Sequence, residues 1–240
     1  MYQGTQITPP FFEVGPKAYL YGDEVLRLAK HADQMSEKYN VSIIFTPQYV
    51  DIPSLVNNTK NLFIFAQHMD PLRVGRGIGS VLPEAIKAAG AKGVLLNHAE
   101  KKIDKEIVAQ TIARADEVGL ISMVCADDQQ KAVEIAQFSP NIIIVESPAL
   151  IGTGKRLDND EVEINKTNLA VWSVDPRILI LHGAGISSGK DVFNIISAGS
   201  QGAGSTSGIV LAKNPFAMLE EMIRASREAW DKKIKKGETN

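Results

Sequence analysis

Three side chains that could move a proton stand at the ends of short apolar runs in the sequence. Glu146 ends the run "IIIVE", His98 ends "KGVLLNH", and Lys17 ends "FFEVGPK". A carboxylate can take a proton from the carbon next to a carbonyl, and a neutral imidazole can polarise the carbonyl oxygen. A lysine ammonium can stabilise the negative charge of the resulting enediolate. This combination indicates isomerisation through an enediolate, provided that the fold brings the three residues together.

Two glycine-rich stretches could hold a phosphate group beside them. These are "GAGISSG" at 183–189 and "GAGSTSG" at 202–208. Backbone N–H groups in loops of small residues, ahead of a helix N-terminus, bind phosphate without arginine. Each of these features alone also fits an ordinary strand end or turn, and their combination favours a site. The stretch "GTGKR" lacks the spacing of a Walker loop.

The elements that must position these residues follow a regular alternation. Short apolar runs, typical of parallel strands buried on both faces, alternate with amphipathic stretches at a spacing of about 30 residues. The helix expected over 104–118 should place Ile107, Ile112 and Ala113 near its buried face and Arg114 largely off it. We predict strands over 11–17, 41–47, 61–67, 92–98, 119–126, 141–146, 177–184 and 201–205.

Eight strand–helix units are the number that closes an α/β barrel. We therefore predict a (β/α)₈ TIM barrel of eight parallel strands with outer helices, and the 240 residues agree with the typical length of about 250. No linker or shift in composition divides the chain, so residues 1–240 are expected to form one domain. An open, doubly wound sheet is the alternative. In a barrel the carboxyl ends of the strands meet at one face, which would bring Lys17, His98 and Glu146 together.

Composition limits the partners and the compartment. The chain is 44% hydrophobic and 22% charged with a net charge of -2, which favours neither nucleic acid nor an anionic membrane. No apolar run approaches the roughly 20 residues needed to span a bilayer, and the N-terminus does not resemble a signal peptide. The single cysteine, Cys125, suits the reducing cytoplasm. No group of His, Cys, Asp and Glu has metal-ligand spacing, so no metal is expected.

Several stretches resemble archaeal-type triosephosphate isomerases. "LLNHAEKK" is similar to their N-H-S-E-R-R motif, and residues 66–98 are similar to their third and fourth strand–helix units. "ESPALIGTG" resembles their strand-six glutamate and hinged lid, and "HGAGISSGKDV" resembles their seventh loop. The resemblance extends from about Glu13 to the last helix.

The resemblance implies a role for each candidate residue. Glu146 would be the base, His98 the electrophile and Lys17 the electrostatic lysine, with Glu100 and Asn97 supporting them from behind the rim. It also implies a phosphorylated sugar as substrate, no cofactor, and a homo-oligomer, either a dimer or a tetramer. The phosphate would be held by Gly152, Gly183, Gly185, Thr206 and Ser207. The lid would comprise Pro148, Ala149, Leu150, Ile151, Gly152, Thr153 and Gly154.

The sequence departs from the family pattern at several positions. Gly15 stands where the family has Asn, and Ala99 stands where it has Ser. Gly77, Ile78 and Gly79 replace the His-Thr-Gly tip of the third loop, from which a threonine reaches the partner subunit's site.

These departures bear on the substrate. Gly15 in place of Asn removes a side chain beside Lys17, and Ala99 in place of Ser removes one behind His98, so the pocket is expected to have room for one more hydroxymethyl group. The stretch "FEVGPKAYLYGDEV" resembles a subgroup associated with erythritol and erythrulose catabolism, so an erythrulose (tetrulose) phosphate isomerase is predicted. Triosephosphate isomerase is the first alternative. A Schiff-base aldolase and a non-catalytic phosphate-binding barrel are the others.

The remaining histidines and the cysteine are interpreted as structural. His68 follows the third strand, His31 lies on a helix, and His182 lies inside a strand end. Cys125 near the end of the fifth strand is expected to be buried packing and not a nucleophile.

Overall fold

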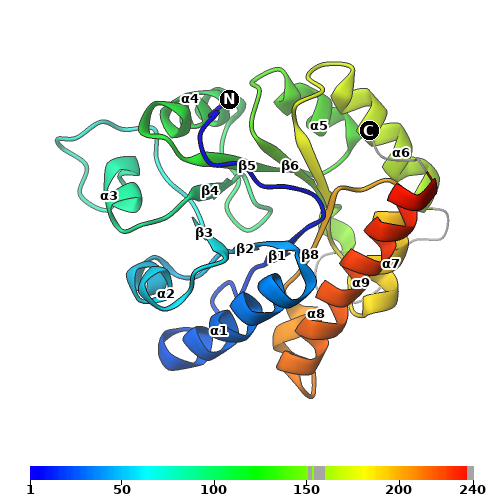
Figure 1. The fold of residues 1–240 in the computed structure, drawn as a ribbon. Coiled ribbons are helices and arrows are strands. Elements are labelled where there is room, and N and C mark those ends of the chain that lie inside the picture. Colours follow the sequence, from blue (N-terminus) through cyan, green and yellow to red (C-terminus); the bar gives the residue numbers. More distant parts are fainter. Residues whose placement is uncertain (151–152, 154–159, 237–240) are drawn as a thin grey trace.

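The computed structural model describes residues 1–150, 153 and 160–236. Within them, eight parallel strands pair in chain order, and β8 pairs with β1 to close a barrel (Figure 1). This confirms the predicted (β/α)₈ TIM barrel and excludes the open sheet. The strands are β1 (Phe11–Val14), β2 (Ser42–Phe45), β3 (Leu62–Ala66), β4 (Gly93–Leu96), β5 (Ile121–Ala126), β6 (Ile142–Val145), β7 (Leu179–His182) and β8 (Gly202–Ser205).

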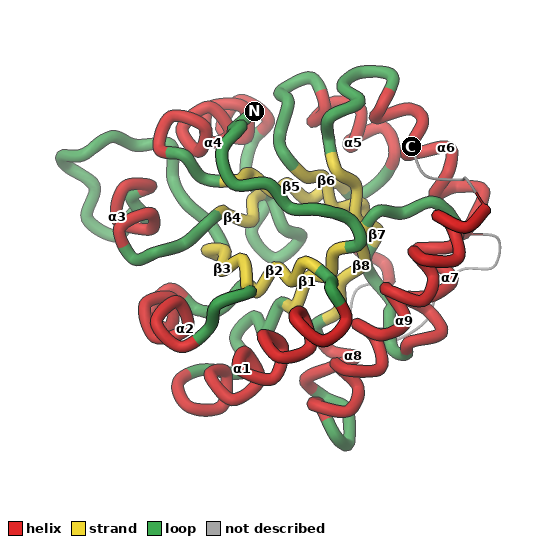
Figure 2. The backbone as a smooth tube through the Cα atoms, in the orientation of Figure 1, coloured by secondary structure: helices red, strands yellow, loops and turns green. Residues whose placement is uncertain are grey.

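Helices surround the barrel (Figure 2). No helix in the described part of the chain is long and apolar enough to cross a membrane. The described helices are α1 (Gly22–Tyr39), α2 (Ile52–Asn58), α3 (Pro83–Ala88), α4 (Lys105–Val118), α5 (Gln129–Ala136), α6 (Asp160–Trp172), α7 (Gly189–Ser197), α8 (Ser207–Val210) and α9 (Pro215–Lys236), with two 3₁₀ turns, η1 (Tyr49–Asp51) and η2 (Pro148–Leu150).

All eight strands are shorter than the sequence predicts, and the missing residues lie at both ends. β1 ends at Val14, β4 at Leu96 and β6 at Val145. Lys17, His98 and Glu146 therefore follow the strands, and Glu146 is still tied to β5 by its backbone N–H, which donates to the carbonyl of Ala126 over 2.9 Å. This placement frees their side chains to point into the space above the barrel.

The prediction for α4 is wrong at two positions. Ala113 is exposed, whereas Arg114 is buried with only 6% of its surface accessible. The guanidinium of Arg114 lies 2.6 Å from Glu84 and 2.5 Å from Glu117, so its charge is paired although the side chain is buried. Helical periodicity predicts that charged residues face the solvent. It does not reveal ion-pair partners such as Glu84, which lies on a different helix, α3.

The barrel interior has its own core, separate from the layer between strands and helices. Large inward side chains stand opposite glycines: a Cβ on Gly202 would lie 2.5 Å from the ring of Phe11, and one on Gly93 equally close to Phe65. This alternation of large and small residues fills the barrel up to the level of the strand ends. The interior cluster consists of Ile7, Phe11, Ile44, Phe65, Leu95, Ile121, Met123, Cys125, Ile142, Ile144 and Leu181.

Candidate active site

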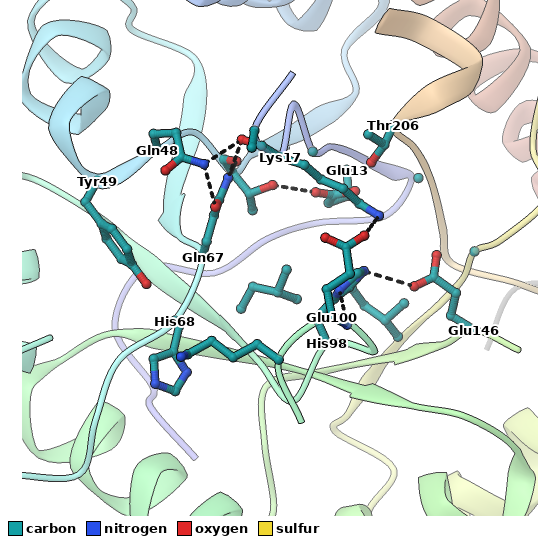
Figure 3. Close-up of a pocket in the computed structure, with 18 of the residues that line it drawn as sticks. Glu13, Lys17, Gln48, Tyr49, Gln67, His68, His98, Glu100, Glu146 and Thr206 are labelled. Atoms are coloured by element: carbon teal, nitrogen blue, oxygen red, sulfur yellow. Dashed lines mark hydrogen bonds and ion pairs between the residues drawn. The ribbon is translucent and has the colours of Figure 1, made fainter. Parts of the chain in front are cut away.

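A pocket of about 540 Å³ opens above this interior core, at the carboxyl ends of the strands. It brings together Lys17, His98 and Glu146, which are separated widely in the sequence (Figure 3). Apolar side chains of Leu95 and Leu181 contribute to its lining. The site thus combines titratable groups with an apolar environment, in which electrostatic interactions are stronger than in water.

His98 and Glu146 face the same space. Nε2 of the His98 ring lies 3.7 Å from Oε2 of Glu146, slightly beyond hydrogen-bond length. Both side chains are largely buried, with 16% and 20% of their surfaces exposed. A small molecule beside them could contact both groups at once, as proton transfer next to a polarised carbonyl requires.

The hydrogen bonding of His98 fixes which ring nitrogen carries the proton. The backbone N–H of Glu100 donates to Nδ1 of His98 over 3.1 Å, so Nδ1 is an acceptor and the neutral ring carries its proton on Nε2. Burial, followed by the charge of Lys17, lowers the pKa of His98 below its ordinary value. The ring is therefore a neutral hydrogen-bond donor that points towards Glu146.

Burial raises the pKa of Glu146, and the charge of Lys17 and a backbone N–H of Ala184 partly offset that rise. A carboxylate with a raised pKa is a stronger base than one in water, which suits it to removing a proton from carbon. The adjacent loop leaves room for it, since a Cβ on Gly183 would lie 3.0 Å from Oε1 of Glu146. Glycine at 183 thus keeps the carboxylate free to move.

Lys17 is held in an uncommon backbone conformation. Its φ of 49° lies in the left-handed region, which non-glycine residues adopt rarely and often at functional sites. Its carbonyl accepts hydrogen bonds from the side-chain amides of Gln48 and Gln67, at 2.8 and 3.0 Å. These contacts hold the lysine backbone where its side chain reaches the pocket.

The two residues predicted behind the rim both contact the loops that carry the cluster. Oε1 of Glu100 lies 2.5 Å from Nζ of Lys17. Burial opposes ionisation of Glu100, but the hydrogen bond and charge of Lys17 outweigh it and lower the pKa. Asn97 donates from Nδ2 to the carbonyl of Cys125 and accepts at Oδ1 from the N–H of Ile103. It thereby anchors the loop that carries His98.

The predicted phosphate-binding residues are distributed unevenly. Gly183 and Thr206 line the pocket, together with Ser205. Gly185, with a φ of 70°, and Ser207, at the start of α8, belong to the adjoining loops and are not among the lining residues. Gly152 lies outside the described residues. Two of the five predicted phosphate-binding residues thus line the pocket. The phosphate site itself remains a prediction.

Only part of the predicted lid is described. Pro148, Ala149 and Leu150 form the 3₁₀ turn η2, in which Pro148 and Ala149 are exposed. Thr153 donates through its hydroxyl to the carbonyl of Leu150 over 2.8 Å. The other three lid residues, Ile151, Gly152 and Gly154, lie outside the described residues, so the lid also stays a prediction.

Glu13, which is not among the predicted site residues, lies inside β1 and lines the pocket (Figure 3). The hydroxyl of Thr46 donates to its Oε1 over 2.7 Å. Burial raises the pKa of Glu13 from 4.5 to about 7 against the lowering effect of Thr46, and the charge of Glu146 raises it further. A carboxylate within the apolar run "FFEV", two residues after the inward-facing Phe11, is the signal that could have revealed it.

The residues interpreted as structural have partners that fit that interpretation. His31 contacts the carbonyl of Phe216, and His182 contacts the amide oxygen of Asn168. Cys125 is buried, and burial raises the pKa of its thiol well above the ordinary value. His68 is buried, lies 3.2 Å from Asp70 and lines the pocket together with it.

Gly15 does not leave the open space that the sequence comparison suggests. A Cβ at this position would lie 2.7 Å from Oε1 of Glu13 and 3.2 Å from the hydroxyls of Thr46 and Thr206. The carboxyl of Glu13 therefore fills the room from which an Asn side chain is missing. Gly15 therefore does not enlarge the pocket for a longer sugar, and this prediction is wrong.

We expect Gly15→Asn to lower the free energy of unfolding by about 1–3 kcal/mol, because the new side chain must displace the Glu13 carboxyl. The backbone is not an obstacle, since Gly15 is not among the glycines with positive φ. Chemical denaturation would measure the change in the free energy of unfolding. The double variant Glu13→Ala/Gly15→Asn is the matched control and should recover most of the lost stability. Equal stability of the single and double variants would contradict a clash between the new side chain and the Glu13 carboxyl.

Comparison with known proteins gives a consistent result. The family model of triosephosphate isomerase matches residues 15–225. The triosephosphate isomerase of Methanothermus fervidus is 39% identical over 203 residues, which cover 84% of this chain and 91% of that protein. Those of Sulfurisphaera tokodaii and Saccharolobus solfataricus are 34% and 31% identical, covering 94% and 92% of this chain and 99% and 98% of theirs. These names support the alternative substrate prediction better than an erythrulose phosphate.

Proposed function

Because the chain belongs to the triosephosphate isomerase family, an isomerase family, we propose that its pocket interconverts dihydroxyacetone phosphate and glyceraldehyde 3-phosphate. The observation that supports this most directly is the shared orientation of His98 and Glu146, with Nε2 and Oε2 separated by 3.7 Å. A phosphate-binding barrel without turnover has no need for a base next to a neutral imidazole.

The proposed reaction gives each of Glu146, His98 and Lys17 one role, and the same roles serve both directions. Glu146 removes the proton from the carbon next to the carbonyl, and the N–H at Nε2 of His98 donates to the carbonyl oxygen. Lys17 stabilises the enediolate. Nε2 of His98 gives its proton to the former carbonyl oxygen and takes the proton of the neighbouring hydroxyl, whose oxygen becomes the new carbonyl oxygen, while Glu146 returns the first proton to the neighbouring carbon. Hydrogen moves between adjacent carbons and oxygens of one molecule, so no external electron acceptor and no cofactor is required.

The triose phosphate is preferred over the tetrulose phosphate for two reasons. The similar proteins carry the name triosephosphate isomerase, and the room expected beside Gly15 is occupied by the carboxyl of Glu13. A Schiff-base aldolase is disfavoured because Nζ of Lys17 is paired with Glu100. A charged lysine near the base Glu146 is suited to stabilising negative charge and not to forming a Schiff base.

A coupled assay over C3 and C4 sugar phosphates tests the proposal. We expect kcat/KM to be highest with glyceraldehyde 3-phosphate and lower with erythrulose phosphates by about 10–200-fold, the range for one carbon group in a pocket. A higher kcat/KM with an erythrulose phosphate would restore the original prediction. Absence of isomerisation with either substrate would leave a binding protein, and borohydride trapping with substrate would identify an aldolase.

We also propose that the chain forms a homo-oligomer through the third loop. The tip residue Ile78 is fully exposed, and Val74 in the same loop is 74% exposed. Exposed apolar side chains that gather on one surface mark interaction sites, which supports this loop as the contact with a second copy. Light scattering should give a mass of at least two chains for the wild type, and Ile78→Asp should lower it; Val50→Asp, at an exposed residue of η1, is the control expected to leave it unchanged.

A further inference from the structure

Glu13 places a second carboxyl in the pocket, and the proposed reaction does not use it. The residue belongs to β1, four positions before Lys17, so it lies deeper in the barrel than the cluster at the strand ends. It lines the pocket with Leu95, Ile144 and Leu181. A half-buried carboxyl beside such apolar side chains is costly to ionise, so its presence requires an explanation.

The barrel provides space for this carboxyl. Glu13 pairs in register with Gly204 across the β1–β8 contact, and a Cβ on Gly204 would lie 3.0 Å from Oε2 of Glu13. On the other side, a Cβ on Gly15 would lie 2.7 Å from Oε1. Two glycines, one on β8 and one after β1, thus border the carboxyl, and a larger residue at either position would displace it.

One oxygen of the carboxyl is already occupied. Oε1 accepts the hydroxyl proton of Thr46 over 2.7 Å. The proton of the neutral acid therefore falls on Oε2, which makes this oxygen a hydrogen-bond donor at the pocket floor. A carboxylic acid kept neutral by an apolar site can donate in this way to an oxygen of a bound molecule.

We propose that Glu13 is a substrate-contacting residue of this site, which as a neutral acid donates a hydrogen bond from Oε2 to an oxygen of the bound sugar phosphate. The inference rests on the proposed function and adds a residue to it. After ionisation Glu13 has no proton to donate, and its negative charge repels both the phosphate and the enediolate. Loss of this one proton therefore weakens substrate binding.

The groups around Glu13 set when that proton is lost. Thr46, after β2, favours the ionised form through its hydrogen bond, and the ammonium of Lys17, after β1, does the same. Burial and the charge of Glu146, after β6, oppose ionisation. The remaining titratable groups that approach from β4 and β5 are His98, Glu100, Lys101 and Cys125.

Profiles of kcat/KM against pH test the proposal, because kcat/KM reports ionisations of the free enzyme. Wild-type kcat/KM should fall about tenfold per pH unit above about 7, the pKa of Glu13. Glu13→Gln keeps a donor without a titrating proton, so its profile should lose this fall while activity at pH 6 stays within about tenfold of wild type. Ionisation of the substrate phosphate is common to both proteins and cancels in the comparison.

Two further variants separate the effect from general disturbance. Thr46→Val removes the hydrogen bond that favours the ionised form, so the fall in kcat/KM should move to higher pH. Glu134→Gln makes the same chemical change on α5, outside the pocket, and should leave the profile as in wild type. If Glu13→Gln does not fold, the shift in Thr46→Val decides the matter.

Calorimetric titration with phosphoglycolate provides a readout that needs no turnover. Its affinity for wild type should fall between pH 7 and 9, with a smaller fall for Glu13→Gln. A wild type that turns over no sugar phosphate overturns the proposed function, and the titration then still tests Glu13. The role of Glu13 is overturned if the wild type is active but its pH profile of kcat/KM and its calorimetric titration both match those of Glu13→Gln. That outcome leaves the proposed function intact.

Discussion

Glu146→Gln is expected to lower kcat by at least about 10²-fold, since the amide has the shape of the carboxylate but cannot accept the proton. The environment of Glu146 makes this loss large. Its carboxylate is 20% exposed, and burial raises its pKa, so neither bulk water nor a nearby neutral group can readily replace it. The measurement is kcat on glyceraldehyde 3-phosphate at pH 7.5.

Binding distinguishes the loss of the base from loss of the pocket. The affinity for phosphoglycolate should change much less than kcat in Glu146→Gln, because the phosphate contacts are unaltered. The control is Glu134→Gln, where the carboxylate is paired with Lys131 on the outer surface of α5. Near-normal turnover in Glu146→Gln would show that another group removes the proton, and Glu13 would be the first candidate.

His98→Gln is expected to lower kcat by about 10²–10³-fold, the cost of losing one donor to a developing oxyanion. The glutamine can donate an N–H, but its flexible side chain lacks the fixed direction that the Glu100 N–H imposes on the ring through Nδ1. The matched control is His31→Gln on α1, whose ring contacts the carbonyl of Phe216 away from the pocket. This variant should keep wild-type kcat.

The neutral state of His98 also has a pH consequence. Because the pKa of His98 is lowered below 6.5, the neutral ring predominates above that pH and becomes protonated only as the pH falls further. Protonation of His98 should therefore not reduce kcat between pH 6.5 and 8. A rate loss in that range that disappears in His98→Gln would contradict the neutral assignment.

Stability measurements provide a separate test of the state of Glu13. Its pKa is raised from 4.5 to about 7 on folding, so between these values the folded protein holds a proton that the unfolded chain has released. Wild-type stability should thus decrease as the pH rises through this window. Glu13→Gln lacks the titration, so its melting temperature relative to wild type should rise across the same window.

The sequence by itself predicted the fold, and it predicted that Lys17, His98 and Glu146 meet at one pocket. Apolar runs at regular spacing predict parallel strands, and eight of them close a barrel, because strand burial depends on local residue type. The position of Lys17, His98 and Glu146 after their strands was also a local property of the chain. Once closure brings the strand ends together, such residues must meet on one face.

Other features depended on contacts between segments distant in the sequence. Periodicity placed Arg114 outside, but the carboxylates of Glu84 and Glu117 pair with it and allow its burial. The glycine at position 15 predicted empty space in the pocket, but the carboxyl of Glu13 occupies that space.

The state of Glu13 was decided only by the tertiary structure. Its neutral form depends on burial in the pocket that Leu95, Ile144 and Leu181 also line, and its orientation depends on Thr46 after β2 and Gly204 on β8. Residue type and spacing along the chain predict which face of a strand or helix a side chain lies on. The protonation of a carboxyl depends instead on the free energy of desolvation and on charges within a few ångströms, and barrel closure alone determines which segments supply them.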